Sequence, residues 1–410
     1  MGRGQGKAKD RSGRSAGTGF LAILLIVLGI WLAWQVVREA LLVRLPPLVA
    51  LQLAPGSPLV LSRAAEAEFD AGRKDAAAEL ARAALAKAPF DVRSLGFSGM
   101  VEAERGDAER GQALVTLAGN WSLRDGRAHL WLMERNLRQG EYGSGFAHAD
   151  TLIRRRPHTQ PVMFKLFTDV ATADRRAVTA LANTMRADPP WRPAFVAHSS
   201  RDPAGQVLAA ELAIGLARSE APFDAQERAA LYTAFARAAR FDGLRALRAN
   251  LQGPADLVID GGFEGHGGAG PLEWTYRPSP GFTAERARAP GEATGHALHL
   301  VGDGYSGGTA TEQLLLLTPG SYRFRLRFRF DQGDPGDQIS WTLACRPGGA
   351  PIAEVALRRS GLQRWSRAEG AFEVPVAGCG GQQLALKLEP GERRQSLELW
   401  VDDVAITPAS

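Results

Sequence analysis

Cysteine is scarce in this chain: there are two among 410 residues, and both lie towards the C-terminal end. Small secreted folds that replace a hydrophobic core by disulfides need a far higher cysteine density, so that class is excluded. No group of Cys and His has zinc-finger spacing, which excludes that kind of structural zinc site. Hydrophobic residues make up 45% of the chain, which is enough apolar surface for packed cores and excludes wholesale disorder.

Signatures of catalysis are also few. The chain contains no H-E-x-x-H and no P-loop, and its seven histidines are scattered. His296 and His299 form an H-x-x-H, but residues three apart on a strand point to opposite faces, which disfavours a metal pair. The adjacent Asp402 and Asp403 would diverge in the same way, which is poor geometry for a glycosidase. We therefore expect no enzymatic activity, with an unrecognised hydrolase as a remote alternative.

The net charge of +5 is not spread evenly along the chain. Residues 1–45 hold seven basic and two acidic residues, whereas residues 256–410 hold fifteen basic and nineteen acidic ones. No domain therefore carries the broad positive field that nucleic acids need, and we predict no nucleic-acid partner.

The charge-free run from Phe20 to Val37 predicts a membrane-spanning helix. A helix of 18 residues is about 27 Å long, close to the thickness of a bilayer's hydrocarbon core. Trp31 and Trp34 lie near its far end, where indole rings favour the membrane interface. The run is longer than the apolar core of a signal peptide, and no A-x-A site follows it closely. We therefore favour an uncleaved signal-anchor at residues 20–43 over a cleaved signal peptide.

The flanks of this run predict its orientation. Five basic residues precede it and two follow it, which favours a cytoplasmic N-terminus. We predict a disordered cytoplasmic tail at residues 1–19, a linker at 44–57, and a single-pass protein of the inner, cytoplasmic membrane. Residues 44–410 would then lie outside the cytoplasm, in the periplasm of a Gram-negative bacterium.

Three glycines recur every 34 residues, at Gly72, Gly106 and Gly140. A small residue follows each of them five positions later, and a proline follows the first and third after 17 positions. This spacing predicts helical hairpins, because glycine permits the left-handed turn after one helix and a small residue lets the next helix approach closely. The small residues are Ala77, Gly111 and Gly145, and the prolines are Pro89 and Pro157.

The pattern resembles the tetratricopeptide repeat, most clearly from Leu61 to Pro89. Met133 and Leu152 depart from the small positions of that family, and Asp174 stands where the next repeat glycine would fall. We predict a TPR-like helical repeat domain over residues 58–252, with degenerate hairpins in its second half. The resemblance implies a concave surface that binds a protein partner, and the alternative is a spacer.

From residue 253 onward the chain changes to short apolar runs separated by Gly and Pro. From Tyr322 to Phe330, aromatic residues and Leu alternate with four arginines, which is the period of a strand with one buried face. Several such runs predict an antiparallel β-sandwich over residues 253–410. The other expected strands begin near Ala297, Gln338, Glu354, Gln383 and Ser396.

Both ends of this domain resemble galactose-binding-like jelly rolls, especially carbohydrate-binding modules of families 4 and 9. The opening segment is LVIDGGFE, Leu257–Glu264, with Asp260 in place of the usual Asn and Trp274 downstream. The closing segment is LELWVDDVAI, Leu397–Ile406. The resemblance implies a jelly roll and a polysaccharide ligand, although related jelly rolls bind proteins. The expected fold class is thus multidomain α plus β: a transmembrane helix, an α-solenoid and a jelly roll.

The same resemblance implies a structural calcium ion held by Glu264 and Asp403, with Asp402 as a weaker candidate. Calcium takes oxygen ligands, which suits these carboxylates. The alternative is that Glu264 and Asp403 bond the backbone at strand ends. No other cofactor is expected.

Sugar recognition combines aromatic faces with polar groups that bind hydroxyls. On the last strand, Leu399 and Val401 are expected to face inward, so that Trp400 faces outward. Trp341 and Trp365 are expected in the core. The predicted glycan-binding residues are Trp274, Tyr276, Tyr305, Trp400, Arg325 and Arg327, with Phe282 as a further candidate.

The arginines of the Tyr322–Phe330 strand would suit an acidic glycan if they share a face with outward aromatic residues. The alternative is a solvated face balanced by Glu354 and Glu398. Cys345 and Cys379 are predicted to pair, because the domain is expected outside the cytoplasm.

These features predict a non-enzymatic, membrane-anchored periplasmic adaptor. Its solenoid would bind a protein partner and its jelly roll a glycan, in cell-envelope or exopolysaccharide biosynthesis or export. The alternative is a structural scaffold for envelope assembly whose jelly roll binds protein.

Overall fold

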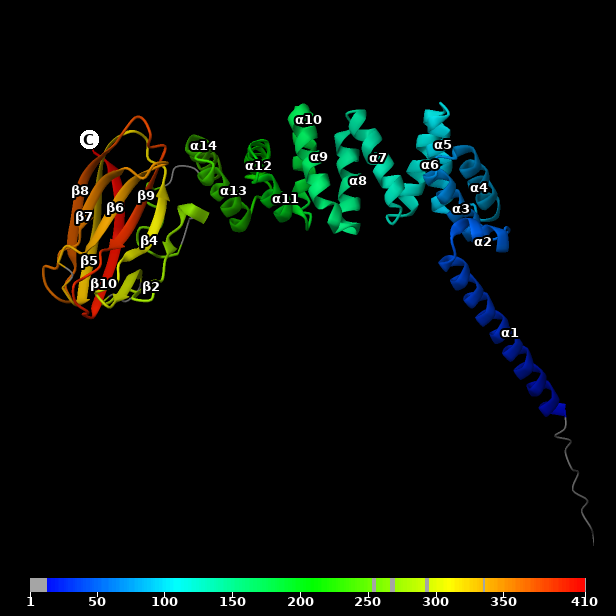
Figure 1. The fold of residues 1–410 in the computed structure, drawn as a ribbon, viewed down its shortest axis with the longest axis horizontal. Coiled ribbons are helices and arrows are strands. Elements are labelled where there is room, and N and C mark those ends of the chain that lie inside the picture. Colours follow the sequence, from blue (N-terminus) through cyan, green and yellow to red (C-terminus); the bar gives the residue numbers. More distant parts are fainter. Residues whose placement is uncertain (1–12, 253–255, 266–269, 292–294, 335, 410) are drawn as a thin grey trace, which may run out of the picture. The chain divides into compact units, whose positions relative to one another are not determined.

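The computed structural model describes residues 13–252, 256–265, 270–291, 295–334 and 336–409. Helices fill the described chain up to Gln252, and strands follow to Pro408, as Figure 1 shows in blue to green and yellow to red. This order confirms the predicted fold class. Contacts divide the chain into two compact units, residues 1–139 and 140–410.

The first unit begins with the helix α1, Gly13–Arg44. Its part from Ile23 to Arg44 is long and apolar enough to cross a membrane, as an anchor or a signal sequence would be. The helix starts seven residues before the predicted Phe20, so residues 13–19, expected to be disordered, are helical. A nucleated helix gains one hydrogen bond for each residue it adds, which favours this extension. Residues 1–12 of the predicted tail lie outside the described residues.

The remaining helices of the first unit are α2 (Pro47–Leu53), α3 (Pro58–Asp70), α4 (Lys74–Lys87), α5 (Val92–Glu104), α6 (Ala108–Trp121) and α7 (Gly126–Arg138). The predicted linker at 44–57 therefore contains a helix. Helices α3 and α4 pack together, as do α5 and α6. Gly72 and Gly106, which precede the second helix of each pair, have φ values of 76° and 104°, the left-handed turn for which glycine is suited.

The helices of the second unit are α8 (Tyr142–Arg155), α9 (Gln160–Ala173), α10 (Arg175–Arg186), α11 (Arg192–Ser199), α12 (Pro203–Leu216), α13 (Ala225–Arg237) and α14 (Phe241–Gln252). Asp174, at the expected place of a repeat glycine, caps α10 instead, because its carboxylate accepts a hydrogen bond from the Arg176 amide. The Arg176 guanidinium, and after it this amide bond, hold the pKa of Asp174 well below its usual range.

In the described residues, ten strands form two five-stranded sheets, ordered β1-β4-β9-β6-β7 and β2-β3-β10-β5-β8. Neighbouring strands within each sheet are antiparallel. The strands are β1 (Thr275–Tyr276), β2 (Phe282–Arg288), β3 (His296–Gly302), β4 (Gly308–Leu315), β5 (Gly320–Gln332), β6 (Ile339–Arg346), β7 (Pro351–Ala356), β8 (Ser366–Val374), β9 (Gly381–Leu388) and β10 (Leu397–Pro408).

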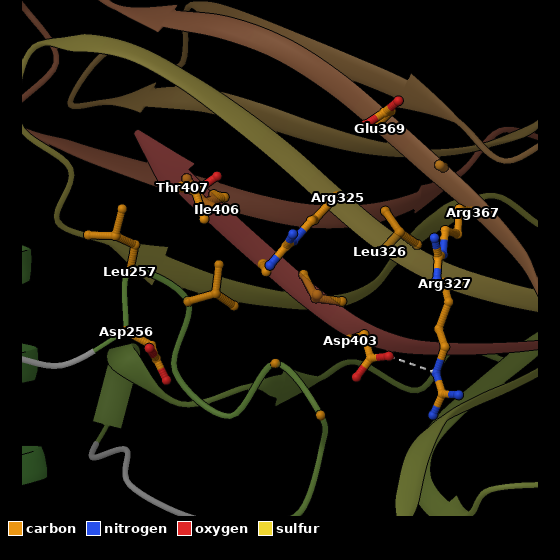
Figure 2. Close-up of a pocket in the computed structure, with 16 residues that line it drawn as sticks. Asp256, Leu257, Arg325, Leu326, Arg327, Arg367, Glu369, Asp403, Ile406 and Thr407 are labelled. Carbon is orange, nitrogen blue, oxygen red and sulfur yellow. Dashed lines mark ion pairs between the residues drawn. The ribbon is translucent and has the colours of Figure 1, made fainter. Parts of the chain in front are cut away.

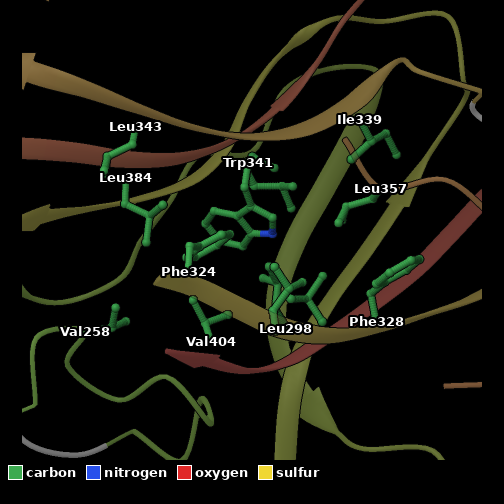
Figure 3. Close-up of a cluster of buried hydrophobic side chains, with 14 of the residues drawn as sticks. Val258, Leu298, Phe324, Phe328, Ile339, Trp341, Leu343, Leu357, Leu384 and Val404 are labelled. Carbon is green, nitrogen blue, oxygen red and sulfur yellow. The ribbon is translucent and has the colours of Figure 1, made fainter. Parts of the chain in front are cut away.

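The sheets bury one apolar core between them. Figure 3 shows Trp341 and Leu384 from one sheet facing Phe324 and Phe328 from the other. The aromatic residues and Leu of β5 are buried and its arginines are not, as the alternation predicted. Cys345 on β6 is bonded to Cys379, which lies two residues before β9, as expected. The disulfide ties two neighbouring strands of one sheet.

Candidate functional site

One outer surface of the sandwich is strongly charged. We call it the outer face: the side of the β2-β3-β10-β5-β8 sheet that points away from the core. Strand β5 places its arginines there, because every second residue of β5 is used by the core. In the register, Arg325 lies opposite Glu369 on β8, and Arg327 lies opposite Asp402 on β10.

A cleft of about 850 Å³ opens over this face. Its floor comes from β5, β8 and β10, and its side wall is the segment from Asp256 to Gly262. Figure 2 shows Arg325 pointing from β5 towards that wall. The volume falls in the range that proteins use for small ligands.

The arginines at the cleft differ in how they are paired. Arg327 bonds Asp402, and its Nε lies 3.0 Å from an oxygen of Asp403, the ion pair dashed in Figure 2. Arg325 and Arg367 are exposed and form no ion pair with any residue that the structure describes. Within the described chain, the cleft therefore presents two guanidinium groups that form no ion pair.

Asp402 is buried beneath this surface. Burial raises the pKa of Asp402, although the bond from Arg327 acts in the opposite direction. Its second oxygen accepts a hydrogen bond from the Asp403 amide at 2.8 Å. Asp403 follows in a left-handed conformation with φ of 53°, at an irregularity in the β5–β10 register. This bulge places Asp403 on the cleft beside Arg327.

Two of the predicted glycan-binding residues, Trp274 and Trp400, are buried. Trp274 lies in the core, where it stacks on Phe263 at 5.1 Å between ring centroids and donates from Nε1 to the Asp260 carbonyl. Trp400 does lie on the outer face, but only 8% of its surface is exposed, because His299 stacks on it at 3.9 Å and Ala297 packs against it. Phe282 is also a core residue.

The prediction that Trp365 lies in the core is also wrong. Trp341 is in the core as expected, but Trp365 is half-buried on the outer face. The guanidinium carbon of Arg327 lies 4.6 Å from the centre of the Trp365 ring. This cation–π contact and the two aspartates fix Arg327 as a structural arginine beside the cleft.

The remaining predicted residues are dispersed. Tyr276 is half-buried at a separate cavity of about 340 Å³, and burial raises its pKa. Tyr305 is exposed in the turn between β3 and β4, under the guanidinium of Arg394. Of the six predicted glycan-binding residues, Arg325 and Arg327 alone line the large cleft in the described chain.

The predicted acidic partners of the arginine row are wrong as well. Glu398 lies 3.0 Å from Nε2 of His299, and Glu354 belongs to β7 in the other sheet. Two arginines of the row are paired with aspartates instead: Asp331 binds Arg329, and Asp402 and Asp403 bind Arg327.

Glu264 and Asp403, the two predicted calcium ligands, contact different residues in the structure. Glu264 accepts a hydrogen bond from the His296 amide at 2.9 Å and lies 3.0 Å from Nδ1 of the same residue. Asp403 faces Arg327. Among the described residues, no three His, Cys, Asp or Glu side chains gather as a metal site would need. The calcium site stays a prediction.

Solved structures that are similar to the β-sandwich include carbohydrate-binding modules. A family 61 module in complex with β-1,4-galactotriose is 16% identical over 38% of this chain and 100% of its own, with a TM-score of 0.28. A family 16 module is 15% identical over 37% and 99%, with a TM-score of 0.28. The xylan-binding family 22 module from Paenibacillus barcinonensis is 15% identical over 33% and 87%, with a TM-score of 0.25. No family model and no curated protein matches the chain.

Arg367, Glu369 and the Asp256–Gly262 wall were not predicted from the sequence. The sequence does contain a signal for Arg367 and Glu369, because charged and small residues alternate from Ser366 to Gly370, as they would along a strand. The wall has no such signal, because it is brought to β5 and β10 by the fold.

A serine motif was also overlooked in the sequence. Gly304–Gly308 reads G-x-S-x-G, the pattern of a hydrolase nucleophile elbow. That elbow lies between a strand and a helix, whereas this segment is a turn between β3 and β4. Its Ser306 hydroxyl bonds the Asp303 carboxylate at 3.2 Å, and the Tyr305 and Ser306 amides donate to the same side chain. These bonds shape a turn.

Proposed function

We propose that this protein is a membrane-anchored, non-enzymatic adaptor whose β-sandwich binds an acidic glycan in the cleft. The observation that carries the proposal is the pair Arg325 and Arg367, which line the cleft without ion pairs to the described chain. A guanidinium group presents two parallel N–H donors that match a carboxylate, so a glycan with uronate groups would supply the missing anions.

The other polar groups of the cleft suit the neutral part of such a ligand. Glu369, Asp403 and Thr407 line it and offer hydrogen bonds to sugar hydroxyls. No aromatic ring lines the cleft among the residues that the structure describes. Binding would therefore depend on charge rather than on stacking, which favours acidic over neutral glycans.

The anchor and the compartment belong to the same proposal. Helix α1 would hold the chain in the cytoplasmic membrane with its N-terminus inside, and the sandwich would lie outside the cytoplasm. The buried disulfide supports this placement, because disulfides persist in oxidising compartments. The process would be the synthesis, polymerisation or export of a polysaccharide at this membrane.

The helical part would bind a protein partner. In the first unit, the exposed rings of Phe90 and Trp121 lie 5.2 Å apart, and Leu123 is exposed next to them in sequence. Exposed apolar residues grouped in this way favour a protein contact. The same observation supports the alternative, a scaffold for envelope assembly, whose sandwich would bind protein and no glycan.

The test is a titration of the full chain in nanodiscs with polygalacturonate and with its methyl-esterified form. Polygalacturonate is expected to bind, and esterification should abolish binding because it removes the carboxylates. Arg325→Ala and Arg367→Ala should each weaken binding by about tenfold, the loss of one charge-assisted hydrogen-bonding group. Titrations with calcium and with chelator test the predicted ion at Glu264 and Asp403.

The control variant is Arg358→Ala, since Arg358 is exposed, binds Asp337 and lies outside the cleft. It should bind polygalacturonate as the unaltered chain does. Equal affinity for both forms of the glycan, or equal loss in all three variants, would exclude the cleft as an acidic-glycan site. A folded chain that binds neither form would favour the scaffold.

A further inference from the structure

The helix that follows α1 has no charged side chain. Helix α2 lies inside a stretch from Leu45 to Ser62 in which no residue is charged. One side of α2 packs inward through Ala50, against Leu42 and Val60. The other side is apolar as well: 41% of Leu48, 44% of Val49 and 68% of Leu53 are exposed.

A helix that faces water carries polar residues on its outer side, whereas one that is apolar all round is covered by protein or lipid. Gln52 is the one polar residue of α2. The exposed side of α2 therefore lacks what contact with water requires, and something apolar must cover it.

The position of α2 relative to α1 is fixed. Arg63 of α3 donates to the carbonyl oxygens of Leu42, at 2.7 Å, and Leu45, at 3.1 Å. Leu42 lies in the last turn of α1 and Leu45 directly follows the helix, so Arg63 binds the chain where α1 ends. Together with the Leu42–Ala50–Val60 cluster, these bonds hold the end of α1, helix α2 and the start of α3 against one another.

The length of α1 determines how deep the junction of α1, α2 and α3 lies in a bilayer. Starting at Phe20, twenty helical residues cover about 30 Å of hydrocarbon and end at Glu39, so the charged Arg38 and Glu39 lie at the edge of the hydrocarbon. Arg44 then lies five residues or about 7.5 Å further, at the outer limit of a headgroup layer that is about 5–7 Å deep. Helix α2 begins three residues later, so it starts at the level of the headgroups.

We infer that α2 is a membrane-interface helix, whose Leu48, Val49 and Leu53 insert into the extracytoplasmic surface of the bilayer. The occupant of its exposed side is lipid, because α2 is clamped to the end of the candidate span and carries no charge. The α3–α4 hairpin is then held against the membrane rather than suspended from a free linker. This inference rests on the proposed anchoring by α1.

The test uses the full chain, whose own cysteines are joined in a disulfide, so that one added cysteine can carry a fluorescent label. Labels are placed at Leu53→Cys on α2, at Ile26→Cys in α1, and at Leu123→Cys, an exposed leucine of the same unit that is 63% exposed. The chain is reconstituted in vesicles of phosphatidylethanolamine and phosphatidylglycerol. Quenching is measured with aqueous iodide and with lipid that carries a nitroxide on its headgroup.

We expect the Leu53 label to be blue-shifted, quenched by the nitroxide lipid and protected from iodide. The Leu123 label should show the reverse. A Leu53 label as open to iodide as the Leu123 label, with Ile26 protected, would overturn the interface helix and leave the anchor standing. A Leu53 label protected from both quenchers would mean that protein covers α2, and would overturn the lipid assignment. An Ile26 label open to iodide would overturn the anchor and this inference together.

Discussion

Arg192 on α11 and Glu227 on α13 form a buried ion pair in the second unit. Nε and Nη2 of the guanidinium donate to the two carboxylate oxygens at 2.8 and 3.0 Å, and further donors reach the carbonyls of Ala221 and Pro222. Glu227 also accepts from the Asp224 amide and completes a capping box at the start of α13. One carboxylate therefore fixes both the start of α13 and the position of α11.

Glu227→Gln should destabilise the helical part strongly. It keeps the shape of the side chain but removes its charge. Among the described residues, Arg192 is then left with one paired carboxylate, that of the exposed Asp188 at 3.2 Å. Breaking a buried ion pair costs about 3–5 kcal/mol, and the residual Asp188 contact favours the lower end, about 3 kcal/mol. Urea unfolding followed by far-ultraviolet circular dichroism measures the change.

The matched control is Glu211→Gln, which breaks the exposed Arg175–Glu211 pair at 2.9 Å. Exposed pairs contribute about 0–1 kcal/mol, so this variant should unfold almost as the unaltered chain does. Equal losses in the two variants would show that burial of the Arg192 pair does not govern its energy.

At this scale, the sequence predicts which face of a strand a residue occupies better than whether the residue is covered. The alternation on β10 placed Trp400 on the outer face, as found. Its burial could not be predicted, because it depends on His299 of β3, about a hundred positions earlier in the chain. The prediction that Trp365 lies in the core was wrong. Trp365 precedes β8, so no alternation of apolar and polar residues along a strand indicated which way its side chain points.

The approach of α5 to α6 depends on Gly111. A Cβ atom at this position would lie 2.6 Å from the backbone nitrogen of Ala103 and 2.6 Å from the carbonyl oxygen of Gly99, both on α5. Gly111→Ala should therefore push the two helices apart and destabilise the first unit by about 1–3 kcal/mol. Thermal unfolding of the full chain measures the change.

Gly143→Ala is the control for helix propensity, because a Cβ atom at Gly143 in α8 would meet nothing within 4 Å. Alanine is the better helix former, so this variant should be neutral or more stable by up to about 1 kcal/mol. A Gly111→Ala chain as stable as the Gly143→Ala chain would contradict the close-packing role of Gly111.

Elements were predictable where their pattern is strong. The glycine spacing predicted the hairpin turns, and the aromatic alternation predicted β5. Strand β8 was missed because Ala368 and Gly370 occupy two of its inward positions. Their small side chains differ little in hydrophobicity from a turn, so the apolar–charged alternation of the strand is weak. The packing explains the glycine: a Cβ atom at Gly370 would lie 2.7 Å from Val355 of β7. Helix α2 was missed because its prolines are typical of a linker, although proline also suits the first turn of a helix.

At the scale of the whole molecule, the order of helices and sandwich was predictable because the periods of helix and strand are local properties of the sequence. The cleft was not, since Asp256–Gly262 and the strands β5, β8 and β10 meet through pairings distant in sequence. The cellular compartment of the sandwich also depends on distant parts of the chain. Helix α1 near the N-terminus would place the sandwich outside the cytoplasm, and the Cys345–Cys379 disulfide near the C-terminus would persist there.

The oxidation state of these cysteines should therefore depend on α1. In a Gram-negative host, the full chain should show no free thiol on alkylation before reduction and two after it. A chain without residues 1–44 should stay in the cytoplasm with two free thiols, because the glutathione and thioredoxin systems keep thiols reduced there. Replacing residues 1–44 by a cleavable secretory signal peptide should restore the disulfide, which separates the effect of compartment from that of the missing helix. Free thiols in the full chain would contradict an extracytoplasmic sandwich, and with it the proposal that this cleft meets a polysaccharide outside the cytoplasm.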